Sequence, residues 1–526
     1  MSFRKRALVC FVVTLCLMLT SGMRVLDISQ REEYLNTAVK QATRRVDVYR
    51  PRGNIYDCNK HPLTGQTYET VTVVLPNEKG YIALNEMLSG EELLKAVESL
   101  KKYTPVTVRG KSLLNSSYCE SFFVPRRYSV GMTHILGYLK GDGHGVTGVE
   151  KAMDELLYCE DNVGLRYYTD SLGKMLASEG VERIEPVHKN SVTLTVDSQI
   201  QFIVERAMNS VEKGAAVIID AATGHIKAVV SRPDYDRESL EKYLDDESSP
   251  LINRAVCAYN VGSVFKPCLA VAALESGLSD YKYTCTGSVE VNGISFKCNR
   301  SLGHGELDLK EALAFSCNTY FYTLSQILGA ERVYNAAKVF RFGESLDCDG
   351  GLISGGGRMP SLESILYSPA ELTNLSIGQG DLLLSPIAVS LMYSAIVNQG
   401  KYLLPRLVLE TQRDGKTKMS EPSLPTVAMS PDTAEIMKEY LKNALQNGTG
   451  SGAFVENVSA GGKTGTAQTG WKDKDRRILN GWFCGFYEGK RSNYTIVVLK
   501  EDVKSGSADC APIFKKITEN MKISGF

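Results

Sequence analysis

The sequence predicts an α+β fold in which one sheet is assembled from both ends of a long domain and helices pack on it. One strand pattern and one hairpin occur within residues 192–231, and three more strand patterns occur within residues 460–502. Between them lie apolar segments with the length and composition of buried helices. The 526 residues are enough for two or three domains. Because 60 basic and 60 acidic residues balance, nothing indicates a nucleic-acid or polyanion partner.

The N-terminal segment has the pattern of a membrane anchor. Arg4, Lys5 and Arg6 precede seventeen uncharged residues, "ALVCFVVTLCLMLTSGM", at 7–23. This length is near the lower limit for spanning a bilayer, and basic residues on the leading side place that side in the cytoplasm. We therefore expect a cytoplasmic tail at 1–6, a single-pass anchor at 7–26 and an extracytoplasmic remainder. A cleaved signal peptide is the alternative, although the segment has no Ala-x-Ala site.

Residues 27–185 are expected to form a separate, non-catalytic domain. Their pattern is mixed: "EEYLNTAVKQATRRV" at 32–46 is typical of a helix, and "TYETVTVVLP" at 67–76 is typical of a strand. The pattern changes near Pro186, so we place a domain boundary there and assign residues 186–526 to the second domain.

The elements of the second domain follow from their periodicity. "VTLTV" at 192–196 alternates as a strand, apolar residues from 200 to 211 keep helical spacing, and residues 214–231 form a hairpin that turns at Thr223–Gly224. Near the C-terminus, "AGGKTGTAQ", "NGWFCGFYEG" and "NYTIVVLKED" are three strands separated by polar turns. The segment "CAPIFKKITENMKI" is a closing helix. Strands from both ends can therefore join in one sheet.

One lysine stands in an otherwise apolar segment, "VGSVFKPCLAVAAL" at 261–274. Pro267 suits the first turn of a helix and Gly277 suits its end. A helix that is apolar all round is buried, so Lys266 must be paired or partly neutral. Ser263 lies three residues earlier, where its hydroxyl shares a face with the amine. A hydroxyl beside a desolvated amine is a nucleophile beside its base.

The Ser-x-x-Lys pattern alone is weak evidence, because it is common. It also occurs at Ser2–Lys5, Ser99–Lys102, Ser171–Lys174 and Ser279–Lys282, none of them within a long apolar helix. The alternative interpretation is a lysine whose amine extends to solvent along its apolar stem.

Two further motifs follow in the second domain. "FSCNTYF" contains Ser316, Cys317 and Asn318, which could also cap a helix. "GGKTGT" contains Lys463, Thr464, Gly465 and Thr466 on a predicted strand. We expect Gly461, Gly462 and Gly465 to leave one side of that strand bare, so that the backbone of a ligand can approach it.

Ser-x-x-Lys, Ser-x-Asn and Lys-Thr-Gly, in this order, are the trio of penicillin-binding proteins and class A β-lactamases. The chain closely resembles a class B penicillin-binding protein, a membrane-anchored peptidoglycan D,D-transpeptidase. "RGNIYD" at 52–57 resembles the family's signature beyond the anchor, and "HILGYL…GVTGVEKAMDELL", with Gly148 and Glu150, resembles its second non-catalytic motif. "TVDSQIQ", "SRPDYD", "INRAV" and "SIGQGDLLLSP" also resemble segments of that family.

The resemblance implies a penicillin-binding/serine β-lactamase-like transpeptidase domain, in which an antiparallel sheet carries helices on both faces. It also implies a transmembrane helix and an elongated N-terminal pedestal or dimerisation domain at 27–185. The chain departs from the family at four positions. Cys58 and Lys60 replace the usual arginine and glycine, and Val261 and Val264 replace a proline and a threonine. None of these changes removes a catalytic group.

The resemblance also implies the catalytic residues. Ser263 would be the nucleophile and Lys266 its base, with Lys463 close enough to lower the Lys266 pKa. Ser316 resembles the family's proton shuttle, and Asn318 the donor that holds the amide of the substrate. Such proton transfer is worth about 10²–10⁴ in rate.

Substrate binding is implied for the Lys-Thr-Gly strand. Thr464, Gly465 and Thr466, together with Lys463, resemble the group that binds the terminal carboxylate. The backbone N–H groups of Ser263 and Thr466 would form the oxyanion hole. The implied reaction cleaves the D-Ala-D-Ala amide of a stem peptide and crosslinks it to an amine, with carboxypeptidase activity as a possible side reaction. β-Lactams mimic this dipeptide and would bind the serine covalently.

Other functions remain as alternatives. A β-lactamase-like hydrolase needs a water-positioning glutamate, and the Glu-x-x-Leu-Asn match at 32–36 lies beside the membrane. A bifunctional enzyme needs a glycosyltransferase domain, for which residues 27–185 are too few. A catalytically minor scaffold of the division or sporulation machinery is the alternative from another class. The family's partner would be a polytopic glycosyltransferase of the shape, elongation, division and sporulation family.

No cofactor is expected, and the six histidines suggest no metal site. The thirteen cysteines are more ambiguous, because their odd number leaves at least one unpaired. Cys285 and Cys298 flank a hairpin that turns at Asn292–Gly293, which brings them roughly opposite each other. They could form a disulfide in an exported domain or remain two free thiols.

Overall fold

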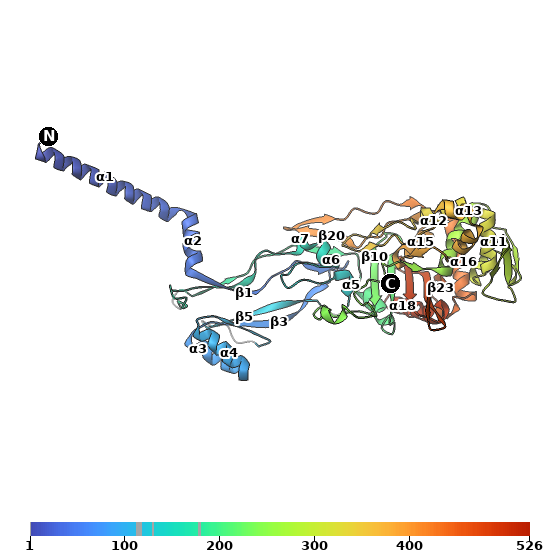
Figure 1. The fold of residues 1–526 in the computed structure, drawn as a ribbon, viewed down its shortest axis with the longest axis horizontal. Coiled ribbons are helices and arrows are strands. Elements are labelled where there is room, and N and C mark those ends of the chain that lie inside the picture. The colour runs from blue at the N-terminus through green and yellow to red at the C-terminus, as the bar shows by residue number, and fades with distance from the viewer. Residues whose placement is uncertain (1, 112–117, 129–130, 177–179) are drawn as a thin grey trace. The chain divides into compact units, whose positions relative to one another are not determined.

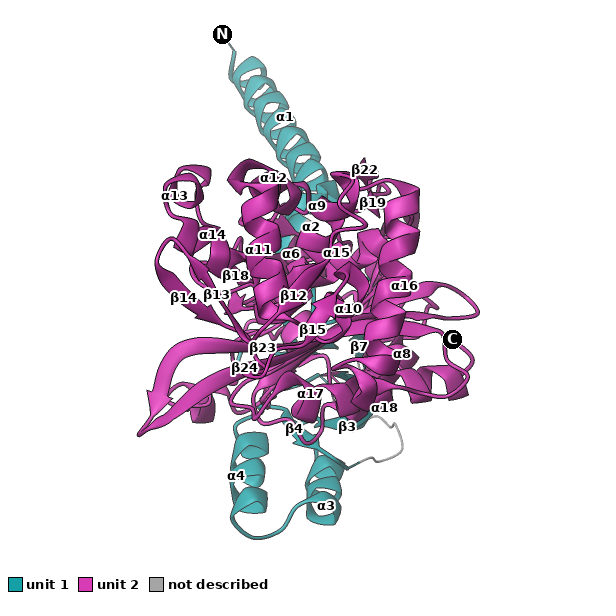
Figure 2. Ribbon diagram, turned by 90° about the vertical axis from the view of Figure 1, so that its right-hand side faces the viewer, with its two compact units in different colours: residues 1–52, 65–127, 159–188 teal, residues 53–64, 128–158, 189–526 magenta. Residues whose placement is uncertain are grey.

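The computed structural model describes residues 2–111, 118–128, 131–176 and 180–526, and it divides into two compact units (Figure 2). The first unit contains residues 1–52, 65–127 and 159–188, and the second contains 53–64, 128–158 and 189–526. Segments from both sides of residue 185 therefore contribute to the second unit. The division of the sequence at that residue stays a prediction.

The first unit begins with α1 (Phe3–Gln30), the one helix within the described residues that is long and apolar enough to cross a membrane. Two three-stranded sheets, β1-β6-β7 and β4-β3-β5, follow it. The remaining elements are α2 (Glu32–Ala42), β1 (Thr43–Tyr49), β3 (Thr64–Val74), α3 (Glu78–Met87), α4 (Gly90–Lys101), β4 (Val106–Arg109), β5 (Cys119–Tyr128), β6 (Val163–Tyr168) and β7 (Val181–Ile184).

The helix expected at 32–46 is wrong in its last four residues. α2 ends at Ala42, and residues 43–46 belong to β1, which pairs with β6 in antiparallel register. Val46 packs there against a small core that contains Val48 and Leu165. Pairing with a strand more than 115 residues away in sequence overrides the local helical pattern. The strand expected at 67–76 is confirmed within β3.

The second unit holds the principal sheet and most of the helices, as labelled in Figure 1. Its strands are β2 (Asn54–Tyr56), β8 (Ser191–Leu194), β9 (Gly214–Asp220), β10 (Ile226–Arg232), β11 (Tyr259–Asn260), β12 (Tyr283–Cys285), β13 (Ser288–Val291), β14 (Ile294–Lys297), β15 (Gly305–Leu307), β16 (Leu346–Asp347), β17 (Ile353–Ser354), β18 (Leu383–Leu384), β19 (Lys401–Tyr402), β20 (Val408–Arg413), β21 (Lys416–Met419), β22 (Thr426–Val427), β23 (Ala460–Asp473), β24 (Arg476–Glu488) and β25 (Asn493–Lys500). Its helices are α5 (Thr133–Leu136), α6 (Gly148–Ala152), α7 (Asp154–Leu157), α8 (Ser198–Ala207), α9 (Lys266–Glu275), α10 (Leu309–Ala314), α11 (Asn318–Leu328), α12 (Ala330–Val339), α13 (Leu362–Tyr367), α14 (Pro369–Ser376), α15 (Pro386–Val397), α16 (Pro431–Asn447), α17 (Gly506–Asp509) and α18 (Ala511–Ile523).

The principal sheet has the order β10-β9-β25-β24-β23, and every neighbouring pair is antiparallel. The prediction that one sheet forms from both ends of the domain is therefore confirmed. The hairpin at Thr223–Gly224 is also confirmed, and Gly224 adopts a φ of +73° in its turn. β23 and β24 are longer than expected, and their far ends project as a ribbon in Figure 2.

Helices cover both faces of this sheet, as the resemblance implied. Along β9, Val217 and Ile219 join a core with α9, α11, α15 and α16, whereas Ala216 and Ile218 join a second core with α8 and α18. The alternation follows from the two-residue period of a strand, which sends successive side chains to opposite faces. A sheet buried on both faces gives the rigid base on which the motifs lie.

The motif at 52–57 ends in a carboxylate that holds β2 to the beginning of α8. Asp57 is fully buried and accepts hydrogen bonds from the backbone N–H groups of Asn59, His61 and Ser198 and from the Ser198 hydroxyl, the last at 2.6 Å. Burial alone would raise the pKa of Asp57, but these hydrogen bonds hold the pKa below its usual value. The carboxylate also lies at the positive end of α8.

Candidate active site

The turn that carries Ser263 leads directly into a buried helix. Residues Gly262–Phe265 form a 3₁₀ turn, and α9 follows from Lys266. Pro267 is in the first turn of α9, and the chain leaves the helix at Gly277 with a φ of +73°. These expectations are confirmed, except that Ser263 precedes the α-helix. Because a 3₁₀ helix has three residues per turn, Ser263 and Lys266 lie one above the other.

Lys266 is fully buried, so the interpretation of an amine extended to solvent is wrong. Its Nζ donates to the Ser316 carbonyl at 2.9 Å and to Asn318 Oδ1 at 2.7 Å, and it lies 3.2 Å from Ser316 Oγ. None of these partners is a carboxylate. Burial lowers the pKa of Lys266 to about 7, because desolvation disfavours the ammonium form.

The turn between α10 and α11 presents both of these partners. Ser316 is buried and has a φ of +57°, which is uncommon for a residue with a side chain. Cys317 follows at the N-cap of α11, and Asn318 is its first residue. The structure therefore brings together Lys266, Ser316 and Asn318, which belong to two separate motifs of the sequence.

Lys463 is the second fully buried lysine of this region and lies on β23. Its Nζ donates to the Thr464 carbonyl at 3.2 Å and lies 3.5 Å from Thr449 Oγ1. Burial, followed by repulsion from Lys266, holds the pKa of Lys463 well below its usual value. The repulsion acts on the pKa of Lys463, whereas burial alone lowers the pKa of Lys266, so the expected lowering of the Lys266 pKa by Lys463 is not found.

Thr449 was missed by the sequence analysis. Its hydroxyl lies 2.8 Å from the Thr464 hydroxyl, and its carbonyl accepts a hydrogen bond from Ser507. It therefore links Lys463 and Thr464 of β23 to the loop after α16. The glycine-rich segment "NGTGSG" at 447–452 was the available signal, because such a segment allows a polar side chain to approach a strand closely.

The expectation that the glycines of β23 leave room for a ligand is wrong. A Cβ on Gly461 would lie 2.8 Å from the Lys442 backbone nitrogen of α16, and one on Gly462 would lie 2.6 Å from the Phe483 ring. A Cβ on Gly465 would lie 2.9 Å from both the Val261 carbonyl and Val264 Cγ1. The glycines instead allow the protein itself to pack tightly against the strand.

Gly465 in particular lets the turn with Ser263 lie against β23. The contact is reciprocal, because a Cβ on Gly262 would lie 2.9 Å from the Thr466 carbonyl oxygen. Thr466 is exposed, and its hydroxyl accepts a hydrogen bond from the Gly506 N–H at 3.0 Å. The backbones of Ser263 and Thr466 therefore belong to adjacent segments, while their role as an oxyanion hole stays a prediction.

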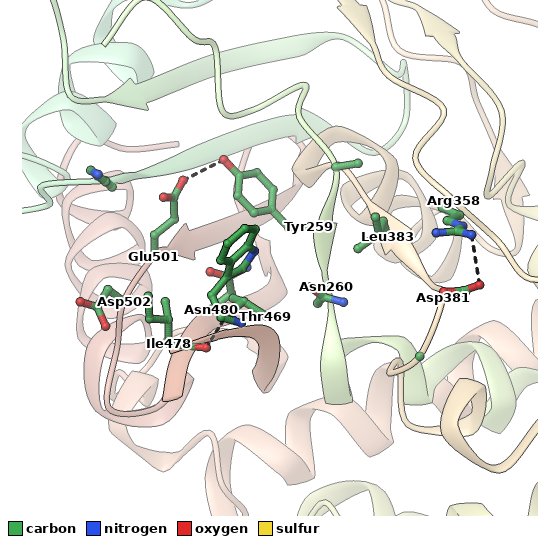
Figure 3. Close-up of a pocket in the computed structure, with 14 residues that line it drawn as sticks. Tyr259, Asn260, Arg358, Asp381, Leu383, Thr469, Ile478, Asn480, Glu501 and Asp502 are labelled. Carbon is green, nitrogen blue, oxygen red and sulfur yellow. Dashed lines mark hydrogen bonds and ion pairs between the residues drawn. The ribbon is translucent and has the colours of Figure 1, made fainter. Parts of the chain in front are cut away.

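A groove of about 660 Å³ lies next to this strand and is shown in Figure 3. Asn260 and Thr469 line it, and they lie three residues from Ser263 and Thr466 along the chain. Its walls also carry two interactions, Tyr259 to Glu501 at 2.9 Å and Arg358 to Asp381 at 3.3 Å. The candidate catalytic side chains do not line this groove, so it adjoins the reacting groups without containing them.

All thirteen cysteines belong to the described residues, and each has a free thiol. Of the two possibilities for Cys285 and Cys298, the structure therefore has the free thiols. The expected hairpin between them is confirmed, since β13 and β14 pair across Asn292–Gly293. Together with His304 and Cys317, these two cysteines form a group whose donor atoms all lie within 4.8 Å of one another.

Comparisons with known proteins agree with this geometry. Residues 214–519 match the family model described as the penicillin binding protein transpeptidase domain. Stage V sporulation protein D of Bacillus subtilis is 28% identical over 98% of this chain and 85% of the relative. The peptidoglycan D,D-transpeptidase MrdA of Salmonella typhimurium is 24% identical over 99% of this chain and 96% of the relative.

Solved structures share the fold. Penicillin binding protein 3 from Mycobacterium tuberculosis, in its apo form, superposes with a TM-score of 0.66 at 23% identity. The match covers 90% of this chain and 96% of that one. The same protein complexed with aztreonam gives the same TM-score, identity and coverage.

We expect Gly465→Ala to destabilise the second unit, because its new Cβ would overlap the turn with Ser263. The cost of such overpacking is about 1–3 kcal/mol, which thermal unfolding would report as a lower Tm. Gly452→Ala is the matched control, since a Cβ there meets its nearest atom at 3.6 Å, an ordinary contact. An unchanged Tm for Gly465→Ala would contradict the packing argument.

Proposed function

The chain belongs to the penicillin-binding protein transpeptidase family, and on this basis we propose that it crosslinks peptidoglycan stem peptides through a serine acyl-enzyme. The observation that carries the proposal is the buried Lys266 amine, whose pKa of about 7 leaves it able to accept a proton. Ser263 lies one 3₁₀ turn before it, and Ser316 and Asn318 hold it in place. The relatives named peptidoglycan D,D-transpeptidase point to the same reaction.

The proposed reaction has two steps. Ser263 Oγ attacks the carbonyl of the penultimate D-alanine while Lys266 takes the serine proton. The amide C–N bond then breaks, D-alanine leaves with the proton that Ser316 relays, and an ester remains on Ser263. In the second step an amine from a neighbouring stem peptide attacks the ester carbonyl. An amide C–N bond forms as the ester C–O bond to Ser263 breaks, and Lys266 transfers the proton that the amine loses to the serine oxygen.

The terminal carboxylate of the substrate would bind at β23. Lys463 is buried, and its partners among the described residues are a hydroxyl and a carbonyl rather than an anion. A buried amine without an anion is costly as a cation, so a carboxylate bound there would restore its charge. The hydroxyl groups of Thr464 and Thr466 lie on the same strand and can donate to that carboxylate.

Fluorescent penicillin should label Ser263 covalently, and Ser263→Ala should abolish the labelling. Lys266→Arg should slow it by about 10²–10⁴, because a guanidinium stays protonated and cannot accept the serine proton. Ser279→Ala is the matched control, since Ser279 belongs to an exposed Ser-x-x-Lys sequence. Labelling that survives Ser263→Ala would refute the assignment, and rapid turnover of penicillin would indicate a hydrolase instead.

The acylation rate should rise with pH through about 7, the pKa of Lys266. Below that pH the amine is protonated and cannot act as a base. At one pH unit below the Lys266 pKa, the acylation rate should therefore be about tenfold lower than its maximum at high pH. Rapid-quench labelling at subsaturating penicillin between pH 5.5 and about 9 would measure this profile. A rate that is independent of pH across this interval would exclude Lys266 as the base.

We further propose that α1 anchors the protein with residues beyond it outside the cytoplasmic membrane. Arg4, Lys5 and Arg6 at its beginning support this orientation. Protease added to intact spheroplasts should degrade the second unit while a cytoplasmic marker stays whole. Full protection would reverse the topology, and a mature chain that starts near residue 23 would identify a cleaved signal peptide.

A polytopic glycosyltransferase of the shape, elongation, division and sporulation family is the proposed partner. α1 has no buried residue, so its apolar surface can pack against other helices within the bilayer. The purified protein should therefore crosslink glycan strands but not polymerise lipid II. Polymerisation by the isolated protein, measured by gel separation of labelled glycan, would refute this division of labour.

A further inference from the structure

Four potential metal ligands converge beside the turn that carries Ser316 and Asn318. Cys285 ends β12, Cys298 follows β14, His304 precedes β15, and Cys317 is the N-cap of α11. Their three sulfur atoms and one ring nitrogen lie within 4.8 Å of one another. Segments spread over 33 residues thus place four soft donors around one point.

Three of the six distances between these donor atoms match a tetrahedron around a zinc ion, and the other three are at most 4.8 Å. With Zn–S bonds of about 2.3 Å and Zn–N bonds of about 2.0–2.1 Å, the ligand atoms are separated by about 3.8 Å for two sulfurs and about 3.6 Å for sulfur and nitrogen. Cys298 Sγ lies 3.8 Å from Cys317 Sγ, and His304 Nδ1 lies 3.5 Å from Cys285 Sγ and 3.6 Å from Cys298 Sγ. A disulfide would bring two sulfurs to about 2.05 Å and leave the third with the imidazole.

One hydroxyl group lies within hydrogen-bond distance of two of the sulfur atoms. The Thr319 hydroxyl donates to Cys285 Sγ at 3.0 Å and lies 3.4 Å from Cys317 Sγ, whereas Cys298 Sγ lies 3.1 Å from Asn299 Oδ1. Such a hydroxyl donor stabilises the negative charge of a metal-bound sulfur and fixes its orientation. Cys285 and Cys317 are buried, so the centre is largely shielded from solvent.

We propose that Cys285, Cys298, His304 and Cys317 bind one zinc ion in a closed structural site. Three thiolates and one imidazole are an established zinc ligand set, and four protein ligands leave no open position for catalysis. Zinc is also the ion that tetrahedral sulfur–nitrogen sites favour. This inference replaces the expectation of no metal, which considered the histidines alone.

The position of Cys317 indicates which residues the metal would stabilise. This residue lies between Ser316, whose φ is +57°, and Asn318, and both neighbours contact Lys266 Nζ. A metal bond in the middle of this strained turn would hold it against relaxation and join it to the β12–β15 segment. The zinc thus stabilises the positions of Ser316 and Asn318 in the candidate active site without contacting the substrate.

The test begins with the metal content of the full chain, purified in detergent with its affinity tag removed. We expect about one zinc per chain by mass spectrometry, and loss of most of it in Cys298→Ser. Cys257→Ser is the matched control, because Cys257 is a partly exposed thiol outside the cluster. Protein that has no zinc and takes up none after reduction, or a disulfide within the cluster in peptide maps of the native protein, would overturn the proposal.

Cobalt substitution covers the case in which Cys298→Ser fails to fold. The wild-type protein, stripped of metal and given Co²⁺, should show the intense visible bands of tetrahedral cobalt and a thiolate charge-transfer band. Their absence would refute the site.

Removing zinc should also lower the Tm and slow penicillin acylation by about tenfold or more. An unchanged Tm would refute this stabilising role of the zinc. The zinc content itself does not depend on whether the proposed transpeptidase activity is correct.

Discussion

The burial of one amine without a carboxylate is the constraint on which this structure depends. Lys266 loses its hydration on an apolar helix, and three oxygen atoms of Ser316 and Asn318, at the beginning of α11, replace the water. A carboxylate in their place would hold the ammonium form and raise the pKa. Neutral oxygens satisfy the amine without that effect. The left-handed backbone at Ser316 is the conformational cost of presenting two of those oxygens at one point.

Close backbone approach is the second requirement, and it is met at glycine. The turn with Ser263, the strand with Lys463 and the beginning of α17 meet where Gly262, Gly465 and Gly506 have no side chain. A Cβ on Gly506 would lie 2.0 Å from the Gly465 carbonyl oxygen. Because these three positions have no side chain, the backbones of the three segments can approach one another closely. The doubly covered sheet keeps β23 from moving away.

The parts of this architecture that could be predicted are those encoded locally. Two-residue alternation revealed β8, the turn at Thr223–Gly224 between two apolar segments revealed β9 and β10, and the apolar surroundings of Lys266 revealed α9. The three short motifs identified the candidate catalytic residues because each motif is contiguous. Thr449 and the cysteine–histidine group were missed, since their significance arises only when distant segments meet. The end of α2 was misplaced for a related reason: β6, far along the chain, takes residues 43–46 into a sheet.

The order of strands in the principal sheet determines when it can form. β9 hydrogen-bonds to β25 at positions such as Val217 and Val497, which are about 280 residues apart in the chain. As the chain is synthesised, β9 and β10 therefore remain a hairpin with an unpaired edge until β25 has also emerged. An unpaired, apolar strand edge invites pairing with other chains. Folding of this protein thus includes an interval in which the fully buried strand β9 is exposed to misassociation.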